Sequence, residues 1–213
     1  MSATDRLLTT LREDRVLIVV RAARVPDPRG LADTLASCGI RVVEVTLTTD
    51  GALDAIRSMA GDDSLIVGAG TVLTADDARR SIAAGAQYLV TPTVAPDVAE
   101  VAHANAIPIL LGAFTPTEVL AAHRLGAAAV KVFPARALGP SYLRDLAGPL
   151  PDVALVPSGG VDHANAAAFL DAGALAVSVG GSSAPADAVQ RGDHGAIDAS
   201  LRALVAAIAA HPR

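Results

Sequence analysis

Two ionisable residues stand inside apolar runs of this chain. Lys131, in Ala-Val-Lys-Val-Phe, is the single lysine among 17 basic residues, and Glu44 lies in Val-Val-Glu-Val-Thr. Removal from water favours the neutral amine of a lysine, which can attack a ketone and form a Schiff base, whereas arginine stays protonated. A nearby carboxylate could then move protons. The pair indicates Schiff-base chemistry, and a chance lysine or a structural salt bridge is the alternative.

Eight short apolar runs must position these two residues. They recur at a spacing of roughly 20–26 residues, with helix-like segments between them. Nearly continuous apolar runs are typical of parallel strands that are covered on both faces. The predicted strands are 16–21, 42–47, 65–70, 88–93, 108–113, 128–134, 154–160 and 175–181.

This repeat predicts an α/β fold, a (β/α)₈ TIM barrel with an extra N-terminal helix at about residues 3–14. A doubly wound sheet is the alternative, but no G-x-G-x-x-G follows the first strand. We expect one domain over residues 1–213, with 199–210 as the eighth helix. Thr74 and Thr115 are predicted helix caps, while the dipeptide Asp62-Asp63 is predicted to lie in a solvated turn.

Strand parity predicts that the two ionisable residues meet. Glu44 shares a strand face with Thr46 and Thr48, and Lys131 shares one with Phe133. The second and sixth strands lie opposite each other in an eight-stranded barrel, and alternate strands supply the same layers of the lumen. Because buried ion pairs stabilise poorly, a pair at the catalytic end favours function over structure.

Glycine pairs end the seventh and eighth strands, in Ser-Gly-Gly (158–160) and Val-Gly-Gly-Ser-Ser (179–183). Many barrels bind phosphate on backbone N–H groups at these two strand ends. A tight turn would also need glycine, so one pair alone is weak evidence. Two pairs on these two strands predict a phosphate site.

Composition excludes several other classes of function. A net charge of −5 without a basic run argues against nucleic-acid binding. No leader and no long apolar run is evident, and the single cysteine, Cys38, is expected to be inert core in a reducing compartment. We therefore expect a soluble cytoplasmic protein without membrane association. No histidine ends a predicted strand, so no metal or other cofactor is expected; the five are His103, His123, His163, His194 and His211.

The motifs together resemble those of the class I 2-keto-3-deoxy-6-phosphogluconate (KDPG) and 4-hydroxy-2-oxoglutarate (KHG) aldolases. The resemblance covers about residues 5–208, in order and at the family's spacing. The motifs that carry it are EVTLTT (44–49), VGAGTV (67–72), VTPTVAPDV (90–98), VKVFPA (130–135), LGPSYLRDLAGPLP (138–151), VPSGGV (156–161) and VGGSSAPAD (179–187).

The resemblance implies a metal-independent, Schiff-base-forming aldolase that assembles as a homotrimer. It identifies Lys131 as the Schiff-base lysine and Glu44 as the catalytic glutamate. It also implies that Thr71 helps to bind the substrate carboxylate. The remaining substrate-binding residues that it suggests are Pro92, Phe133, Gly159, Gly160, Gly181 and Ser182.

The chain departs from the family pattern in three places. Thr48 stands where many members have a carboxylate-binding arginine, and Arg21, which ends the first strand, is assigned that contact instead. Leu111 replaces a common proline before the glycine of the fifth strand. The loop after Ser182 is short, which leaves the distal end of the substrate least defined.

The sequence therefore predicts a lyase that cleaves KDPG to pyruvate and glyceraldehyde 3-phosphate. KHG or the galactonate-derived epimer is the alternative substrate within the family. A phosphate-binding barrel isomerase or epimerase would need an aspartate pair or metal-binding histidines at strand ends. A non-enzymatic phospho-ligand binding module would have no use for a lone lysine in the lumen.

Overall fold

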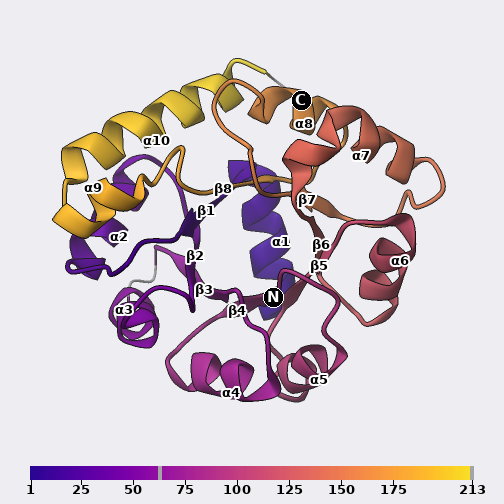
Figure 1. The fold of residues 1–213 in the computed structure, drawn as a ribbon, viewed down its shortest axis with the longest axis horizontal. Helices are drawn as coiled ribbons and strands as arrows, with labels where there is room; N and C mark the ends of the chain where they lie inside the picture. The colour runs from indigo at the N-terminus through magenta and orange to yellow at the C-terminus, as the bar shows by residue number, and fades with distance from the viewer. Residues whose placement is uncertain (62–63, 212–213) are drawn as a thin grey trace.

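The computed structural model describes residues 1–61 and 64–211, and it forms a ring of parallel strands surrounded by helices (Figure 1). The predicted turn residues Asp62 and Asp63 lie outside the described residues. The strands are β1 (Val16–Val20), β2 (Val42–Thr46), β3 (Ile66–Gly70), β4 (Tyr88–Val90), β5 (Ile109–Ala113), β6 (Ala129–Val132), β7 (Leu155–Pro157) and β8 (Val177–Val179).

The sheet closes nearly completely into a barrel. Its strand order is β7-β6-β5-β4-β3-β2-β1-β8, and every neighbouring pair is parallel. The two outer strands meet through a bridge between Ser158 and Ser178 and a 2.8 Å hydrogen bond from the Leu175 N–H to the Leu155 carbonyl. The predicted (β/α)₈ barrel is therefore confirmed.

Helices follow the strands and cover the outside of the barrel (Figure 1). Their bounds are α1 (Ala3–Asp14), α2 (Pro28–Ser37), α3 (Ala52–Met59), α4 (Ala75–Ala83), α5 (Pro96–Ala104), α6 (Pro116–Arg124), the 3₁₀ turn η1 (Ala135–Ala137), α7 (Gly139–Ala147), α8 (Ala166–Asp171), α9 (Ala186–Arg191) and α10 (His194–Ala209). No helix within the described ranges combines the length and apolar character that a membrane span requires.

Local signals set several of these helix ends. The predicted caps at Thr74 and Thr115 are present, and each hydroxyl accepts a backbone N–H three residues later. Glu118 completes a capping box at Thr115. Its carboxylate accepts hydrogen bonds from the backbone N–H groups of Thr115 and Phe114, and these bonds hold the pKa of the carboxyl below its usual range. The last helix begins at His194 rather than near residue 199, because Asp193 caps it by accepting the Ala196 N–H at 3.0 Å.

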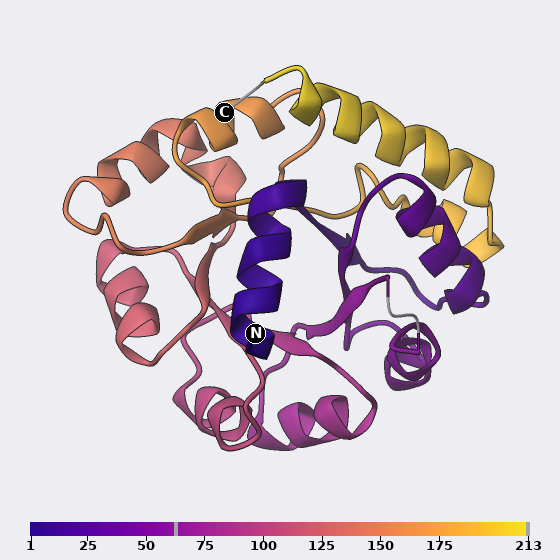
Figure 2. The same cartoon turned by 180° about the vertical axis from the view of Figure 1, so that it is seen from behind.

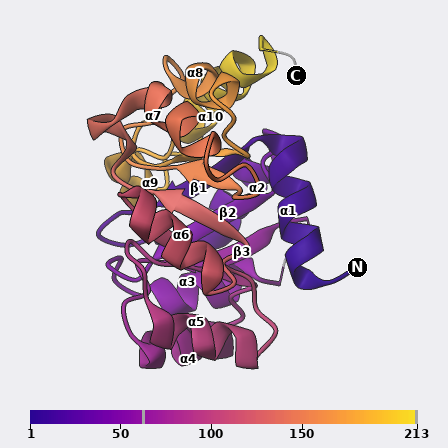
Figure 3. The same cartoon turned by 90° about the vertical axis from the view of Figure 1, so that its right-hand side faces the viewer.

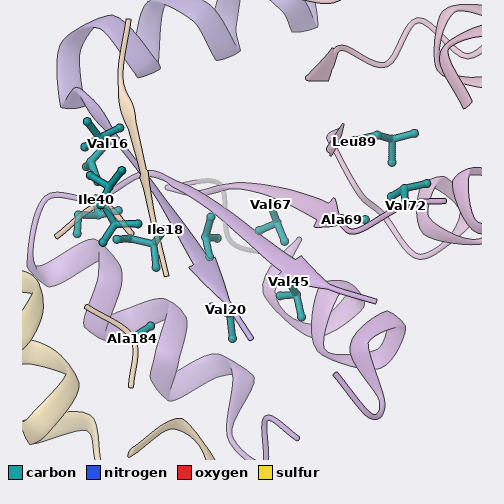
Figure 4. Close-up of a cluster of buried hydrophobic side chains, with 14 of the residues drawn as sticks. Val16, Ile18, Val20, Ile40, Val45, Val67, Ala69, Val72, Leu89 and Ala184 are labelled. Atoms are coloured by element: carbon teal, nitrogen blue, oxygen red, sulfur yellow. The ribbon is translucent and has the colours of Figure 1, made fainter. Parts of the chain in front are cut away.

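The core has two layers that follow the alternation of side chains along each strand. Outward-facing residues pack beneath the helices, and Figure 4 shows this layer with Val16, Ile18 and Val20 pointing to one side of β1. Inward-facing residues fill the lumen, among them Leu17 and Val42. Lumen residues near the C-terminal ends of the strands are therefore available for a site.

Helix α1 closes the other end of the barrel. It begins at the capping box formed by Ser2 and Asp5, lies across the ring of strands in Figure 2, and stands at one end of the barrel in Figure 3. Leu7 and Leu11 are fully buried and pack against Ile66 and other residues at the starts of the strands. The predicted N-terminal helix is confirmed, and it seals the N-terminal end of the lumen.

Candidate active site

Lys131 of β6 and Glu44 of β2 meet inside the barrel. The lysine Nζ lies 3.3 Å from the glutamate Oε1, across the lumen. Lys131 is 5% exposed and Glu44 is fully buried, so the pair is removed from bulk water. Strand parity thus places these residues correctly, although contact alone does not assign them a role.

Glycines on β3 and β5 make room for the pair. A Cβ built at Gly70 would lie 2.7 Å from the Glu44 Oε1, so the carboxylate occupies the space of the missing side chain. A Cβ at Gly112, which pairs with Lys131 in the sheet, would lie 2.2 Å from the carbonyl carbon of Pro92. Both glycines therefore allow close approach, one by a carboxylate and one by the β4–α5 loop.

A pocket of about 360 Å³ opens beside the lysine, at the C-terminal ends of β6, β7, β8 and β1. The ring of Phe133 forms part of its wall, with the lysine Nζ 5.8 Å from the ring centroid. The pocket brings together seven residues named from the sequence: Arg21, Lys131, Phe133, Gly159, Gly160, Gly181 and Ser182.

The loop after β7 turns its carbonyl groups into the protein. The carbonyls of Gly159 and Gly160 accept hydrogen bonds from the Arg136 N–H at 2.9 Å and from the Asn165 side chain at 2.9 Å. The Ser182 hydroxyl donates to the Val161 carbonyl at 3.1 Å, which joins this loop to the one after β8.

The N–H groups of Gly160, Gly181 and Ser182 lie beside the pocket and have no acceptor within the part of the chain that the structure describes. Because Gly160 has a φ of 86° and Gly181 has open space around its Cβ position, the backbone can approach a ligand closely at both. Free N–H groups from two loops form a suitable site for an anion.

Thr71 and Pro92 lie outside the residues that line this pocket. Thr71 follows Gly70, the residue over which the Glu44 carboxylate lies. Its φ of 57° is in the left-handed region, which non-glycine residues adopt at a cost in conformational energy, often at functional sites. Thr48, where the family often has arginine, is instead linked to the Thr46 hydroxyl at 3.0 Å.

Arg136 is a pocket residue that sequence reasoning missed. A Cβ at Gly160 would lie 2.5 Å from the Arg136 Cβ, so the arginine lies directly against the glycine turn. Neither Arg136 nor Arg21 has an ion-pair partner in residues 1–61 and 64–211. The sequence contained one signal, since Arg136 stands three residues after Phe133, near a predicted strand end.

Tyr88 is a second residue that sequence reasoning missed. Its side chain is fully buried in the lumen, and burial, together with the charge of Glu44, holds the pKa of its phenol well above the usual value. The hydroxyl therefore stays protonated and can act as a hydrogen-bond donor. A tyrosine at a lumen position was not distinguished from an ordinary apolar residue of the strand.

None of the five histidines lines the pocket, and neither does Cys38. His103 and His123 are in helices, and within the described ranges no group of three or more histidine, cysteine or acidic residues could hold a metal ion. Cys38 caps α2 and donates to the Asp198 Oδ1 at 3.3 Å. Burial, followed by this contact, raises the pKa of its thiol, which disfavours a nucleophilic thiolate.

The barrel, the buried lysine–glutamate pair and the neighbouring anion pocket define a class of (β/α)₈ enzyme with its site at the C-terminal face. The model of the family described as KDPG and KHG aldolase matches residues 7–200. The chain belongs to this family, and it is accordingly an aldolase, a lyase that cleaves carbon–carbon bonds.

Similar proteins agree with this assignment. The 2-dehydro-3-deoxy-phosphogluconate aldolase of Pseudomonas aeruginosa is 35% identical over 213 residues, which is 99% of this chain and 96% of the relative. A KDPG aldolase structure from Zymomonas mobilis with 3-phosphoglycerate is 30% identical, covers 93% of this chain and 94% of its own, and has a TM-score of 0.82. A Legionella pneumophila KDPG aldolase with pyruvate captured as a covalent carbinolamine is 26% identical, covers 92% and 97%, and has a TM-score of 0.83.

Proposed function

We propose that this chain reversibly cleaves KDPG to pyruvate and glyceraldehyde 3-phosphate through a Schiff base on Lys131. The observation that carries the proposal is the single lysine of the chain, buried 3.3 Å from the Glu44 carboxylate and beside the anion pocket. The names of the related enzymes support this substrate, and the carbinolamine of the Legionella protein supports covalent chemistry at a ketone.

The reaction begins when the neutral amine of Lys131 attacks the C2 ketone of the substrate. Loss of water gives an iminium, and Glu44 accepts the proton of the C4 hydroxyl. The C3–C4 bond then breaks, its electron pair passes to the iminium nitrogen, and the aldehyde leaves. Protonation of the resulting enamine at C3 and hydrolysis of the new iminium release pyruvate and the free amine.

The two ends of the substrate carry negative charge and need separate partners. We assign binding of the substrate carboxylate to Thr71 and Arg21. Pro92 and Phe133 would line the space between the carboxylate and the phosphate. The distal phosphate lies at the two glycine loops, on the N–H groups of Gly159, Gly160, Gly181 and Ser182. The N–H groups of Gly160, Gly181 and Ser182, which have no acceptors in the described residues, support this assignment, and the Zymomonas relative was solved with a phosphorylated carboxylate, 3-phosphoglycerate.

The assembly and location of the chain are part of the same proposal. We assign it to a cytoplasmic homotrimer that acts on a small phosphorylated keto acid and needs no metal or other cofactor. The single cysteine is consistent with a reducing compartment, and the resemblance to the family is the basis for the trimer. Sedimentation analysis would test the trimer.

Borohydride trapping tests the chemistry at Lys131. Reduction in the presence of pyruvate should place a pyruvate-derived adduct on the peptide that carries this residue, and the assignment is unambiguous because the chain has one lysine. Lys131→Arg, which keeps the charge but cannot provide a neutral amine, should give no adduct. An adduct confined to the N-terminal amine of the wild type would refute the mechanism.

A comparison of KDPG with KHG as substrates tests the proposed binding site for the phosphate end of the substrate. The value of kcat/KM should be higher for KDPG than for KHG, which lacks the phosphate. Gly160→Val should raise KM for KDPG much more than it slows trapping with pyruvate, because the glycine turn lies against the distal pocket. A wild type that prefers KHG would replace the proposed substrate with the alternative and remove the need for the phosphate site.

A further inference from the structure

Three buried polar atoms that face the barrel lumen lack partners. They are the second carboxylate oxygen of Glu44, Oε2, and the hydroxyls of Tyr88 and Ser178, and none has a hydrogen-bond partner within residues 1–61 and 64–211. Leaving a buried donor and a buried acceptor both unpaired is costly, and proteins usually satisfy such groups directly or through an internal water. The Glu44 Oε2 is an acceptor and the Tyr88 hydroxyl can donate, so one internal water can link them.

The sheet register places the two residues in one row. Glu44 on β2 pairs with Gly68 on β3, and Gly68 pairs with Tyr88 on β4. The residue between them has no side chain, so nothing from β3 separates the two lumen-facing groups.

The tyrosine ring fills that gap. A Cβ built at Gly68 would lie 2.4 Å from the Cζ of Tyr88, the carbon that bears the hydroxyl. The ring therefore leans over Gly68 toward β2. The Glu44 carboxylate lies over Gly70, two residues further along β3, where the missing Cβ would be 2.7 Å from Oε1. The phenol thus lies next to the carboxylate, on the side nearer to α1.

We propose that Tyr88 is a positioning residue for Glu44: its hydroxyl donates a hydrogen bond to one internal water, and that water donates to the Glu44 Oε2. This bridge holds the carboxylate so that its other oxygen, Oε1, faces Lys131. The inference rests on the proposed function, because it concerns the proton transfers assigned to Glu44. Tyr88 itself touches no reacting atom.

Few charged groups surround this carboxylate. Lys131 faces it from β6 and Tyr88 from β4, whereas α1 contributes Leu7 and Leu11 to the lumen. Arg21, at the end of β1, is exposed and lines the outer pocket. A change at Tyr88 should therefore register directly in the pH dependence of the step that Glu44 carries.

The test is Tyr88→Phe, which removes the hydroxyl and keeps the ring that packs over Gly68. A hydrogen bond to a charged group favours the charged form, so its loss should move the acid limb of the kcat–pH profile to higher pH. The value of kcat should fall about tenfold, in line with the loss of one such bond, while KM and the rate of pyruvate trapping change less than about twofold. In a Glu44→Gln background the same substitution should have no further effect on kcat.

Tyr142→Phe is the matched control, because the chain has two tyrosines and the hydroxyl of this one donates to the Phe114 carbonyl, away from the lumen pair. It should leave the profile unchanged. Replacing both tyrosines with 3-fluorotyrosine, a stronger donor, should move the acid limb to lower pH, and this arm does not depend on the folding of the Phe variant.

Two outcomes separate the possible failures. A Tyr88→Phe enzyme with the wild-type kcat and pH profile, or a fluorotyrosine enzyme with no shift, would overturn the role of Tyr88 while trapping at Lys131 stays intact. Absence of an adduct at Lys131 in the wild type would instead refute the proposed function.

Discussion

Gly70→Ala tests whether the position of the Glu44 carboxylate limits turnover. The new Cβ would lie 2.7 Å from Oε1 and 2.9 Å from Cδ, whereas ordinary contacts begin at 3.4 Å. The carboxylate must therefore retreat by about 0.7 Å, which can stretch its 3.3 Å contact with the Lys131 Nζ to about 4 Å, beyond hydrogen-bond range. A misplacement near 1 Å can cost a factor of about 100, so we expect kcat to fall by roughly 10- to 100-fold.

The assay compares steady-state cleavage of KDPG with borohydride trapping of pyruvate. Turnover should fall while the adduct at Lys131 still forms, because the substitution moves the proton-transfer group and leaves the nucleophile. Gly148→Ala is the matched control, since its Cβ would meet its nearest neighbour at an ordinary 3.7 Å. A Gly70→Ala enzyme within about threefold of wild type in kcat would show that the carboxylate tolerates displacement and that its exact position does not limit turnover.

Two further predictions concern charge and pH. Arg136→Ala should raise KM for KDPG about tenfold, because a charge-assisted contact to the distal anion is lost, and should leave trapping with pyruvate unchanged; a KM within about twofold of wild type would remove Arg136 from the binding site. The free energy of unfolding should hold up to about pH 10 and fall as the pH rises further, because the phenol of Tyr88 ionises in the unfolded chain while burial and the charge of Glu44 keep its pKa raised in the folded one. Urea unfolding across this range should show the fall flattened in Tyr88→Phe, and an equal fall in that variant would contradict the prediction.

Much of the architecture could be predicted because it follows from local rules. Continuous apolar runs give the eight strands, and a two-residue alternation places Glu44 and Lys131 in the same lumen. The bounds of α1 and the caps at Thr74 and Thr115 follow from hydrogen bonds made within a few residues.

The missed residues depend on contacts between distant segments. Arg136 reaches the pocket because its backbone and that of Ala135 bond to the loop after β7, through the Gly159 and Ser158 carbonyls at 2.9 and 2.7 Å. The position of Tyr88 beside Glu44 depends on the register of three strands and on the absence of a side chain at Gly68. Neither the loop pairing nor the register can be obtained from the spacing of apolar residues in one chain.

The same division applies to the two ends of the candidate site. Sequence alone assigned Arg21 and Thr71 to the substrate carboxylate, but it did not show that Arg21 also lines the pocket of the glycine loops whereas Thr71 lies outside that lining. Side-chain reach across a barrel rim is set by the strand tilt and by loops of unequal length. Residue type and strand order do not contain that information.

The burial of the chain's one lysine also determines how the protein surface responds to amine chemistry. Lys131 is 5% exposed, whereas Met1 at the N-terminus is 91% exposed. Acylating reagents that are too bulky to enter the pocket should therefore leave Lys131 of the resting protein unmodified. Coupling of a dye or a solid support through amines would then spare the reactive group of the lumen.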